Sequence, residues 1–387
     1  MYLILQYYVT PQSLQYDSTW ADKDLSNMQC PESISLCYRS TRIYFGTMLE
    51  AIVSAGPKVK VIHSEIPTPG PDQVLIRVAV AAANPKDWKV PEWTGTEKNQ
   101  GDDGAGFVEA VGTNVAGFKK GDRCAGFHET GSAGGTYGEY ALFPAHLTLH
   151  VPSNMSFEEA STVPVTAGTA AVGLFATDGG LGLPSPASPA SEPMPLVIYG
   201  ASGSVGAFAV QLAKKANIHP LICVAGAGAK TIEHLLDHSK GDTIVDYRKS
   251  DKAVTQAISA ALSGEPLKHA LDTIAHGSTS TNIAGAMTDG GTIARTLPGE
   301  GELPNGVEQF QLSVSVVHTQ QQDFGRDMYE LFGQGLEHGW LEPRPFEIVR
   351  GGLNSVEKAL IDLKAGKASA VKYVLRIDET DGLDGTA

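Results

Sequence analysis

Residues 196–215 decide the fold, and they begin Leu196-Val197-Ile198-Tyr199-Gly200-Ala201-Ser202-Gly203-Ser204-Val205-Gly206. A short apolar run leads into three glycines at i, i+3 and i+6, and a helical pattern follows at once, which predicts a strand, a tight turn and a helix. Glycines suit this turn because the backbone must approach a pyrophosphate, whose charge is stabilised by free N–H groups at the helix start. A strand-to-helix turn without a ligand is the alternative. The stretch predicts a dinucleotide site that includes Gly200, Ser202, Gly203, Ser204, Val205 and Gly206.

The second strand of this unit indicates which dinucleotide is bound. In the pattern that prefers NAD, an acidic residue about 20 positions further on bonds the ribose 2′-hydroxyl. Here the strand at 220–224 runs into small residues and Lys230, and no Asp or Glu occurs between Leu212 and Ile232. A 2′-phosphate would meet no repelling carboxylate, so we predict NADPH. The alternative is that Lys230 is only a solvated residue.

Composition agrees with a soluble enzyme. A chain of 387 residues with 42% hydrophobic and 19% charged residues is long enough for two or three domains. The net charge of −14 repels phosphate backbones, which argues against a nucleic-acid partner. The apolar start at 1–8 is too short to span a bilayer, so no membrane partner is expected. The four cysteines, Cys30, Cys37, Cys124 and Cys223, have no paired spacing, which is typical of reduced thiols in a cytosolic protein.

The pattern along the chain changes at two places. A mixed, aperiodic stretch covers residues 1–47, and short strands and turns follow from Met48 to about Val151. Strand and helix then alternate to about residue 335, which predicts a doubly wound parallel sheet of α/β class. The later strands are expected at 243–247, 269–273, 291–294 and 312–317.

Several motifs carry a family resemblance over residues 48–378. They are Asn84-Pro85-Lys86-Asp87-Trp88-Lys89, Gly101-Asp102-Asp103-Gly104-Ala105-Gly106, the glycine turn, residues 241–248 and Gly366-Lys367-Ala368-Ser369-Ala370-Val371-Lys372-Tyr373-Val374. In this order they resemble the medium-chain dehydrogenase/reductase superfamily. They resemble most its zinc-free fungal branch, which includes trans-acting enoyl reductases of polyketide pathways and aldehyde or quinone reductases.

The resemblance implies a domain organisation and a site. It implies a GroES-like β-rich catalytic domain at 48–165, a Rossmann NADPH-binding domain at 166–335 and a return to the catalytic domain at 336–380. The aperiodic pattern of residues 1–47 predicts an N-terminal extension that is disordered, or a mis-assigned start of a chain whose folded unit begins at Met48. The resemblance places Asn84, Pro85, Lys86 and Asp87 near the nicotinamide ribose, Thr169 beside the reacting face, and residues 202–205 at the phosphates. It further places Gly226 to Lys230 at the 2′-phosphate, Tyr247 near the adenine, and Ser369 and Ala370 at the nicotinamide end.

The chain departs from the zinc-dependent members of the superfamily. Those members resemble it except that a Cys stands at the position of Asn84 and a His-Glu pair at Asp102-Asp103. Zinc needs thiolate or imidazole ligands in tetrahedral array, so we expect no metal. The two remaining histidine pairs are also not expected to bind a metal ion. His146 and His150 lie in strand-like sequence, and His234 and His238 fit the exposed face of a helix.

These observations predict an NADPH-dependent, zinc-free reductase of an activated C=C bond or carbonyl. A trans-acting enoyl reductase of fungal polyketide metabolism, with a carrier-bound or small acyl substrate and a polyketide synthase as partner, is the first hypothesis. An aldehyde or quinone reductase is the second, and an NADPH-binding protein without turnover is an alternative of another class. No catalytic residue is assigned, because Trp88 and Trp93 occupy the region where some relatives carry a tyrosine. Lys89 is the nearest ionisable candidate, and the alternatives are that it is only a surface lysine and that the substrate's carrier or water supplies the proton. The patterns of short-chain dehydrogenases and of α/β-hydrolases are absent.

Overall fold

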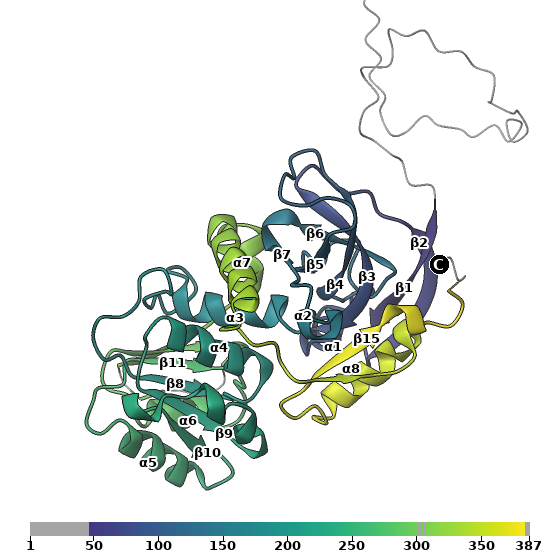
Figure 1. The fold of residues 1–387 in the computed structure, drawn as a ribbon. Helices are drawn as coiled ribbons and strands as arrows, with labels where there is room; N and C mark the ends of the chain where they lie inside the picture. Colours follow the sequence, from purple (N-terminus) through teal and green to yellow (C-terminus); the bar gives the residue numbers. More distant parts are fainter. Residues whose placement is uncertain (1–45, 300–302, 305, 384–387) are drawn as a thin grey trace, which may run out of the picture. The chain divides into compact units, whose positions relative to one another are not determined.

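The computed structural model describes residues 46–299, 303–304 and 306–383 (Figure 1). The predicted extension at 1–47 lies outside the described residues except for its last two, and β1 (Thr47–Ser54) begins with the second of these. None of the described helices is long and apolar enough to cross a bilayer.

The glycine turn belongs to a parallel sheet with six strands in the described part of the chain. The strand order is β10-β9-β8-β11-β12-β13, which is the order of a dinucleotide-binding doubly wound sheet. The strands are β8 (Leu196–Tyr199), β9 (Leu221–Ala225), β10 (Thr243–Asp246), β11 (His269–Asp272), β12 (Gly291–Arg295) and β13 (Val307–Gln311). This confirms the predicted fold class.

Alternating side chains of these strands bury two faces of the sheet. Leu196 and Ile198 pack into one core, whereas Val197 and Tyr199 pack into another. Successive side chains of a strand point to opposite faces, so a strand that is buried on both faces is apolar throughout. The first core includes α3 (Pro164–Phe175), α4 (Ser204–Lys215) and α7 (Gln322–Glu337), and the second includes α5 (Asp251–Ala261) and α6 (Thr279–Ala284).

The β-rich part forms a second sheet. Its path in the described residues is β14-β15-β3-β4-β5-β7, with β6 paired to β3, and β1 pairs separately with β2. The strands are β2 (Lys58–Glu65), β3 (Gln73–Ala82), β4 (Asp103–Val111), β5 (Arg123–Phe127), β6 (Tyr140–Pro144), β7 (Thr148–His150), β14 (Phe346–Ile348) and β15 (Lys372–Arg376). The helices of this part are α1 (Lys86–Thr94), α2 (Phe157–Ala160) and α8 (Val356–Lys364).

The C-terminal segment returns to this second sheet. Strand β15 pairs antiparallel with β3, with Val374 opposite Ala82. This pairing brings residue 372 next to the loop that follows β3, where the Asn84 motif lies. The predicted domain limits at 165/166 and 335/336 stay predictions.

One predicted strand is wrong. Residues 312–317 were expected to be the last strand of the parallel sheet, but the strand is β13, which ends at Gln311, and Val314–His318 forms a 3₁₀ helix. The alternation of Leu and Val with Ser is as compatible with a buried turn as with a strand. Here Leu312 and Val317 are buried in the core that contains α3 and α7, so tertiary packing decides the local conformation.

Candidate active site

A cavity of about 600 Å³ lies where the two sheets contribute residues to one space. Its walls come from the Asn84 loop and α1, from α3, from the start of α4, and from segments that follow β11, β12, β13 and α8. Ligands of doubly wound sheets bind outside the carboxyl ends of the strands, and this cavity occupies that position. The lining residues that the argument below uses are Asn84, Lys86, Lys89, Val90, Trp93, Asp102, Thr169, Ser204, Ile274, Leu297, Leu312, Val314 and Lys372.

Of the sixteen residues predicted for the site, eight line this cavity and eight do not. Those that line it are Asn84, Pro85, Lys86, Thr169, Gly203, Ser204, Val205 and Ala370. Asp87 is fully buried and accepts a hydrogen bond from the Asn84 backbone N–H. Gly200 and Ser202 lie in the turn between β8 and α4, and Gly206 lies in the first turn of α4. Lys230 and Ser369 are exposed.

The turns after β8 and β9 are packed too closely for side chains. Gly200 has a φ of +79°, and a Cβ at Gly206 would lie 2.3 Å from the Gly200 carbonyl oxygen. A Cβ at Gly226 would lie 2.6 Å from the ring of Tyr247, so these two predicted residues are neighbours. A Cβ at Gly228 would lie 2.7 Å from the Cβ of Ala370, which brings the C-terminal loop against the turn after β9.

The start of α4 fits an anionic cofactor group. Its N-cap residue is Gly203, which has no side chain to satisfy the first free N–H groups. Backbone N–H groups at a helix start attract phosphates. The chain thus presents the backbone cradle that the pyrophosphate of a dinucleotide requires.

A buried charged cluster contributes Asn84 and Lys372 to the wall of the same cavity. The Lys372 ammonium is 2.6 Å from Asp103 Oδ2 and 2.8 Å from Asn84 Oδ1, and the Asn84 amide donates to Asp103 Oδ2 at 2.9 Å. Lys372 is 3% exposed and Asp103 is fully buried. These hydrogen bonds use both ends of the Asn84 amide, so its side chain fixes the loop and the C-terminal strand together.

A second lysine completes the cluster. The Lys86 ammonium lies 2.7 Å from Asp102 Oδ2, 3.1 Å from Asp87 Oδ1 and 2.7 Å from the Gln100 carbonyl oxygen. Burial alone would lower the pKa of Lys86, but the two carboxylates outweigh it and hold that pKa above its usual value. Lys86 is therefore a fixed positive charge in the wall of the cavity.

This cluster occupies the positions at which zinc-dependent relatives were expected to hold metal ligands. Asn84, Asp102 and Asp103 are all present, but their oxygens accept hydrogen bonds from lysine ammonium groups. In the described residues, no three His, Cys, Asp or Glu side chains are grouped so that they could hold a metal ion. The four histidines that were considered bind separate partners: His146 bonds Val317 O, His150 bonds Gly117 O, His234 bonds Glu342 and His238 bonds Glu233. His234 and His238 lie in 3₁₀ turns and not on the expected helix.

Asp87 gives the cluster a dependence on pH. Burial raises the pKa of Asp87 to about 6, although Lys86 opposes this shift. The Asp87 carboxylate accepts hydrogen bonds from the Tyr137 hydroxyl at 2.6 Å and from the Asn84 backbone N–H at 2.8 Å. Because the folded state binds this proton more tightly than the unfolded chain does, the contribution of Asp87 to stability is full below about pH 4 and is lost as the pH rises through about 6.

We therefore expect Asp87→Asn to remove part of the pH dependence of stability. The wild-type free energy of unfolding should fall between about pH 4 and pH 7 relative to that of the variant, measured by urea unfolding at each pH. Asp327→Asn, at an exposed position on α7, is the control and should parallel the wild type. Parallel curves for wild type and Asp87→Asn would contradict the assignment.

Of the three lysines that line the cavity, Lys89 is the one for which no acidic partner is found among the described residues. Its ammonium lies 5.4 Å from the ring centroid of Trp88, and burial lowers the pKa of this lysine. The same ring is approached by Lys364, whose ammonium pairs with Glu92. Thr169, on α3, donates its hydroxyl proton to the Val165 carbonyl at 2.6 Å.

Sequence reasoning missed two buried cations of the C-terminal segment, Lys372 and Arg344. Each is separated from its partners by more than 100 residues, and a lysine between apolar residues of a strand is usually taken as exposed. The only available signal for Lys372 was its position in the closing motif 366–374. No local signal marked Arg344.

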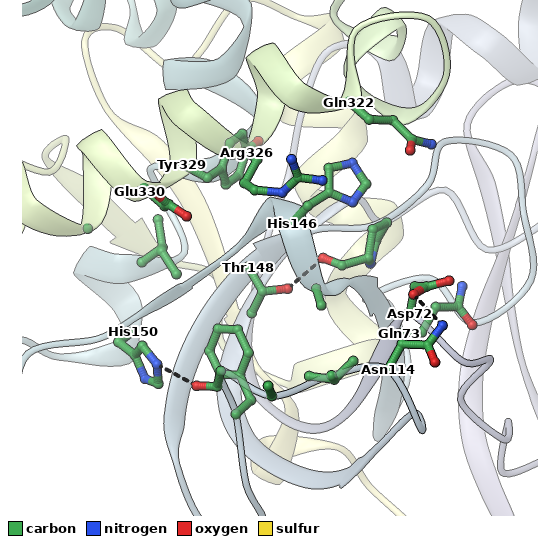
Figure 2. A pocket seen from close by; sticks show the side chains of 18 of the residues that line it. Asp72, Gln73, Asn114, His146, Thr148, His150, Gln322, Arg326, Tyr329 and Glu330 are labelled. Carbon is green, nitrogen blue, oxygen red and sulfur yellow. Dashed lines mark hydrogen bonds between the residues drawn. The ribbon is translucent and has the colours of Figure 1, made fainter. Parts of the chain in front are cut away.

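A second cavity, of about 900 Å³, contains none of the predicted site residues (Figure 2). It lies between α7 and the β-rich part, with Tyr329 and Glu330 on the helix side and Thr148 and His150 on β7. Two of its polar side chains are engaged locally: Thr148 donates to the Pro144 carbonyl, and His150 bonds the Gly117 carbonyl. The first cavity is therefore the candidate active site.

Comparisons with known proteins agree with this architecture. The family model of the alcohol dehydrogenase GroES-like domain matches residues 70–153. A solved structure, that of the CurK enoyl reductase, superimposes with a TM-score of 0.69 at 20% identity and covers 86% of this chain and 99% of its own, which shows the fold.

Two curated fungal proteins are similar in sequence. The trans-enoyl reductase fsr4 of Gibberella fujikuroi is 43% identical over 83% of this chain and 95% of its own length. The trans-enoyl reductase resD of Aspergillus sclerotiorum is 30% identical over 85% of this chain and 100% of its own. With the glycine turn, the two sheets and the closing motif all in place, the chain belongs to the trans-enoyl reductase-like branch of the medium-chain dehydrogenase/reductase superfamily.

Proposed function

We propose that this chain is an NADPH-dependent, zinc-free enoyl reductase that acts in trans on acyl chains carried by a polyketide synthase. The observation that carries the proposal is the cavity, which joins the glycine turn and α4 to Thr169, Lys86 and Lys89. The names of the similar fungal proteins support the same reaction. The proposed compartment is the cytosol, supported by the buried, unpaired thiols of Cys124 and Cys223.

The cavity walls favour an apolar chain as substrate. Val90 and Trp93 on α1 lie on one side, and Ile274, Leu297, Leu312 and Val314 follow the strands of the parallel sheet. Trp93 is 61% exposed and Ile274 is 45% exposed, so large apolar side chains are presented in the walls and not buried in either core. An acyl chain would cover this surface and gain the corresponding hydrophobic free energy.

Different residues of the cavity would bind the cofactor, stabilise the developing negative charge and donate the proton. The backbone of 203–205 and the C-terminal Ala370 would hold NADPH, which supplies the hydride when it is bound. Lys86, fixed by Asp102 and Asp87, would keep positive charge near the oxygen that becomes negative in the transition state. Lys89 would donate the proton that completes the reduction, because burial disfavours its charged form and no acidic partner competes for that proton among the described residues.

The proposal is tested by following NADPH oxidation with a panel of acceptors. The panel contains enoyl thioesters of increasing chain length, free and on an acyl carrier protein, together with aldehydes and quinones. Turnover of the thioesters, with higher kcat/KM on the carrier, is the expected result. Preference for aldehydes or quinones would replace the proposal with the second hypothesis. NADPH binding without turnover of any acceptor would favour the non-catalytic alternative.

A further expected result concerns metal. Exhaustive dialysis against a chelator should leave kcat unchanged, and elemental analysis should find much less than one zinc per chain. The physical reason is that the candidate ligand positions are engaged by Lys86 and Lys372. Chelator-sensitive turnover that zinc restores would contradict this assignment.

A further inference from the structure

Arg344 is a buried cation at the end of the parallel sheet. It is 4% exposed, and its backbone N–H donates to the Thr162 hydroxyl at 3.0 Å. Its guanidinium approaches two turns that follow neighbouring strands: Nη2 is 3.5 Å from the Ser202 carbonyl oxygen and 3.4 Å from the Thr231 hydroxyl. Ser202 belongs to the turn after β8, and Thr231 ends the 3₁₀ turn after β9.

The partners of this guanidinium are too few and too distant to satisfy it. Both contacts are at the long limit for a hydrogen bond, and the described residues provide no partner for the buried Nε. The acidic group that acts on Arg344 is Glu342, which is itself bonded to His234 at 2.8 Å. Burial lowers the pKa of Arg344 to about 10, so it still carries its charge at neutral pH. A buried charge without a counter-ion is costly, and the cost is offset when an anion binds.

The position of Arg344 in the fold indicates which anion it would bind. In a dinucleotide fold the pyrophosphate lies at the start of the first helix, and the adenosine ribose lies at the end of the second strand. The contact of Arg344 with Thr231 places it near the end of the second strand, β9. Its contact with Ser202 places it near the turn that leads into the first helix, α4. An arginine near the end of the second strand is the group that accommodates a 2′-phosphate, because its fork of N–H donors matches phosphate oxygens.

The other cations of this region are less suited. Lys230 is exposed, so solvent would screen its charge from a phosphate. Arg248, which follows Tyr247, is already bonded by Nε and Nη2 to the Asp246 carboxylate, at 2.9 and 2.7 Å. Arg344 alone among the three is both buried and, within the described part of the chain, without a carboxylate bonded to it.

We propose that Arg344 binds the 2′-phosphate of NADPH and sets the preference of this chain for NADPH over NADH. This inference rests on the proposed cofactor. It assigns the specificity of the nucleotide site to a residue outside the predicted nucleotide-binding segment 166–335, in the C-terminal return. Lys230 then adds a weaker, solvent-screened attraction.

The test is calorimetric binding of NADPH, NADH and 2′,5′-ADP to the full chain, without an acceptor substrate. Arg344→Gln should raise the Kd of NADPH and of 2′,5′-ADP by about 10- to 100-fold, the range for hydrogen bonds to charged groups, and leave the Kd of NADH nearly unchanged. Arg344→Lys keeps the charge and should retain part of the selectivity. Lys230→Ala should have a smaller effect than Arg344→Gln.

Two controls separate this role from a structural one. Arg350→Gln removes an exposed arginine that pairs with Glu379 and should change neither Kd. The thermal midpoint of each variant reports folding, and Arg344→Lys keeps the test decisive if Arg344→Gln unfolds.

Equal losses of NADPH and NADH affinity, or selectivity that disappears with Lys230→Ala and survives Arg344→Gln, would overturn the inference. A wild-type chain that binds neither nucleotide would overturn it together with the cofactor. A selective Kd change in a chain that reduces no acceptor would support Arg344 and refute only the proposed reaction.

Discussion

Lys372→Met is expected to lower the free energy of unfolding by about 3–5 kcal/mol, the range for breaking a buried ion pair by removing one partner. The variant would leave the Asp103 carboxylate fully buried and without its ammonium. It would also release Asn84, whose carbonyl accepts the other hydrogen bond of Lys372. Urea unfolding at neutral pH measures the change.

Two further variants test whether this loss of stability comes from the buried ion pair. Lys372→Met combined with Asp103→Asn removes both charges and should recover part of the loss. Lys358→Met removes an exposed lysine that pairs with Asp362 on α8, and Asp362 keeps its second ion pair with Lys367, so the free energy of unfolding should change much less. A loss for Lys372→Met no greater than that for Lys358→Met would show that the buried pair does not hold β15 to the Asn84 loop.

Lys89→Met is expected to lower kcat by about 10²- to 10⁴-fold, the usual contribution of a general acid. The Kd of NADPH should stay the same, because the proposed role of Lys89 is to donate a proton and not to bind the cofactor. Lys89 must be protonated to act, so wild-type kcat should fall as the pH rises through its lowered pKa. That alkaline decline should be absent from the residual activity of the variant.

The matched control is Lys364→Met. Lys364 approaches the same Trp88 ring at 5.2 Å but pairs with Glu92, and it does not line the cavity. Its replacement should leave kcat and its pH profile nearly unchanged. A variant of Lys89 that keeps both wild-type kcat and the alkaline decline would assign the proton to water or to another group.

The sequence was sufficient wherever one short pattern determines one local structure. The apolar run and glycines at 196–206 predicted β8 and the start of α4, because few backbones join a strand to a helix within four residues. The family resemblance added the cavity residues of the Asn84 loop, Thr169 and Ala370. Their roles toward a cofactor stay predictions.

The sequence was insufficient where distant segments determine the environment. The strand expected at 312–317 was wrong because packing against α3 and α7, which a local pattern does not contain, selects a 3₁₀ turn. Lys372 is separated from Asp103 by 269 positions, so nothing near either residue predicts their ion pair. Arg344 escaped prediction for the same reason, since Ser202 lies 142 positions away.

The end of β13 has a consequence for how this enzyme could diversify. Leu312 N–H still donates to Arg295 O of β12, and the chain then leaves the sheet and supplies residues 312–315 to the cavity wall. Substitutions or short insertions after Leu312 would reshape the part of the cavity wall that residues 312–315 form, without shifting the register of the parallel strands. Loops carried by a rigid scaffold tolerate such variation. Duplicated copies of this gene could therefore acquire new acyl substrates through this short segment while the nucleotide site stays the same.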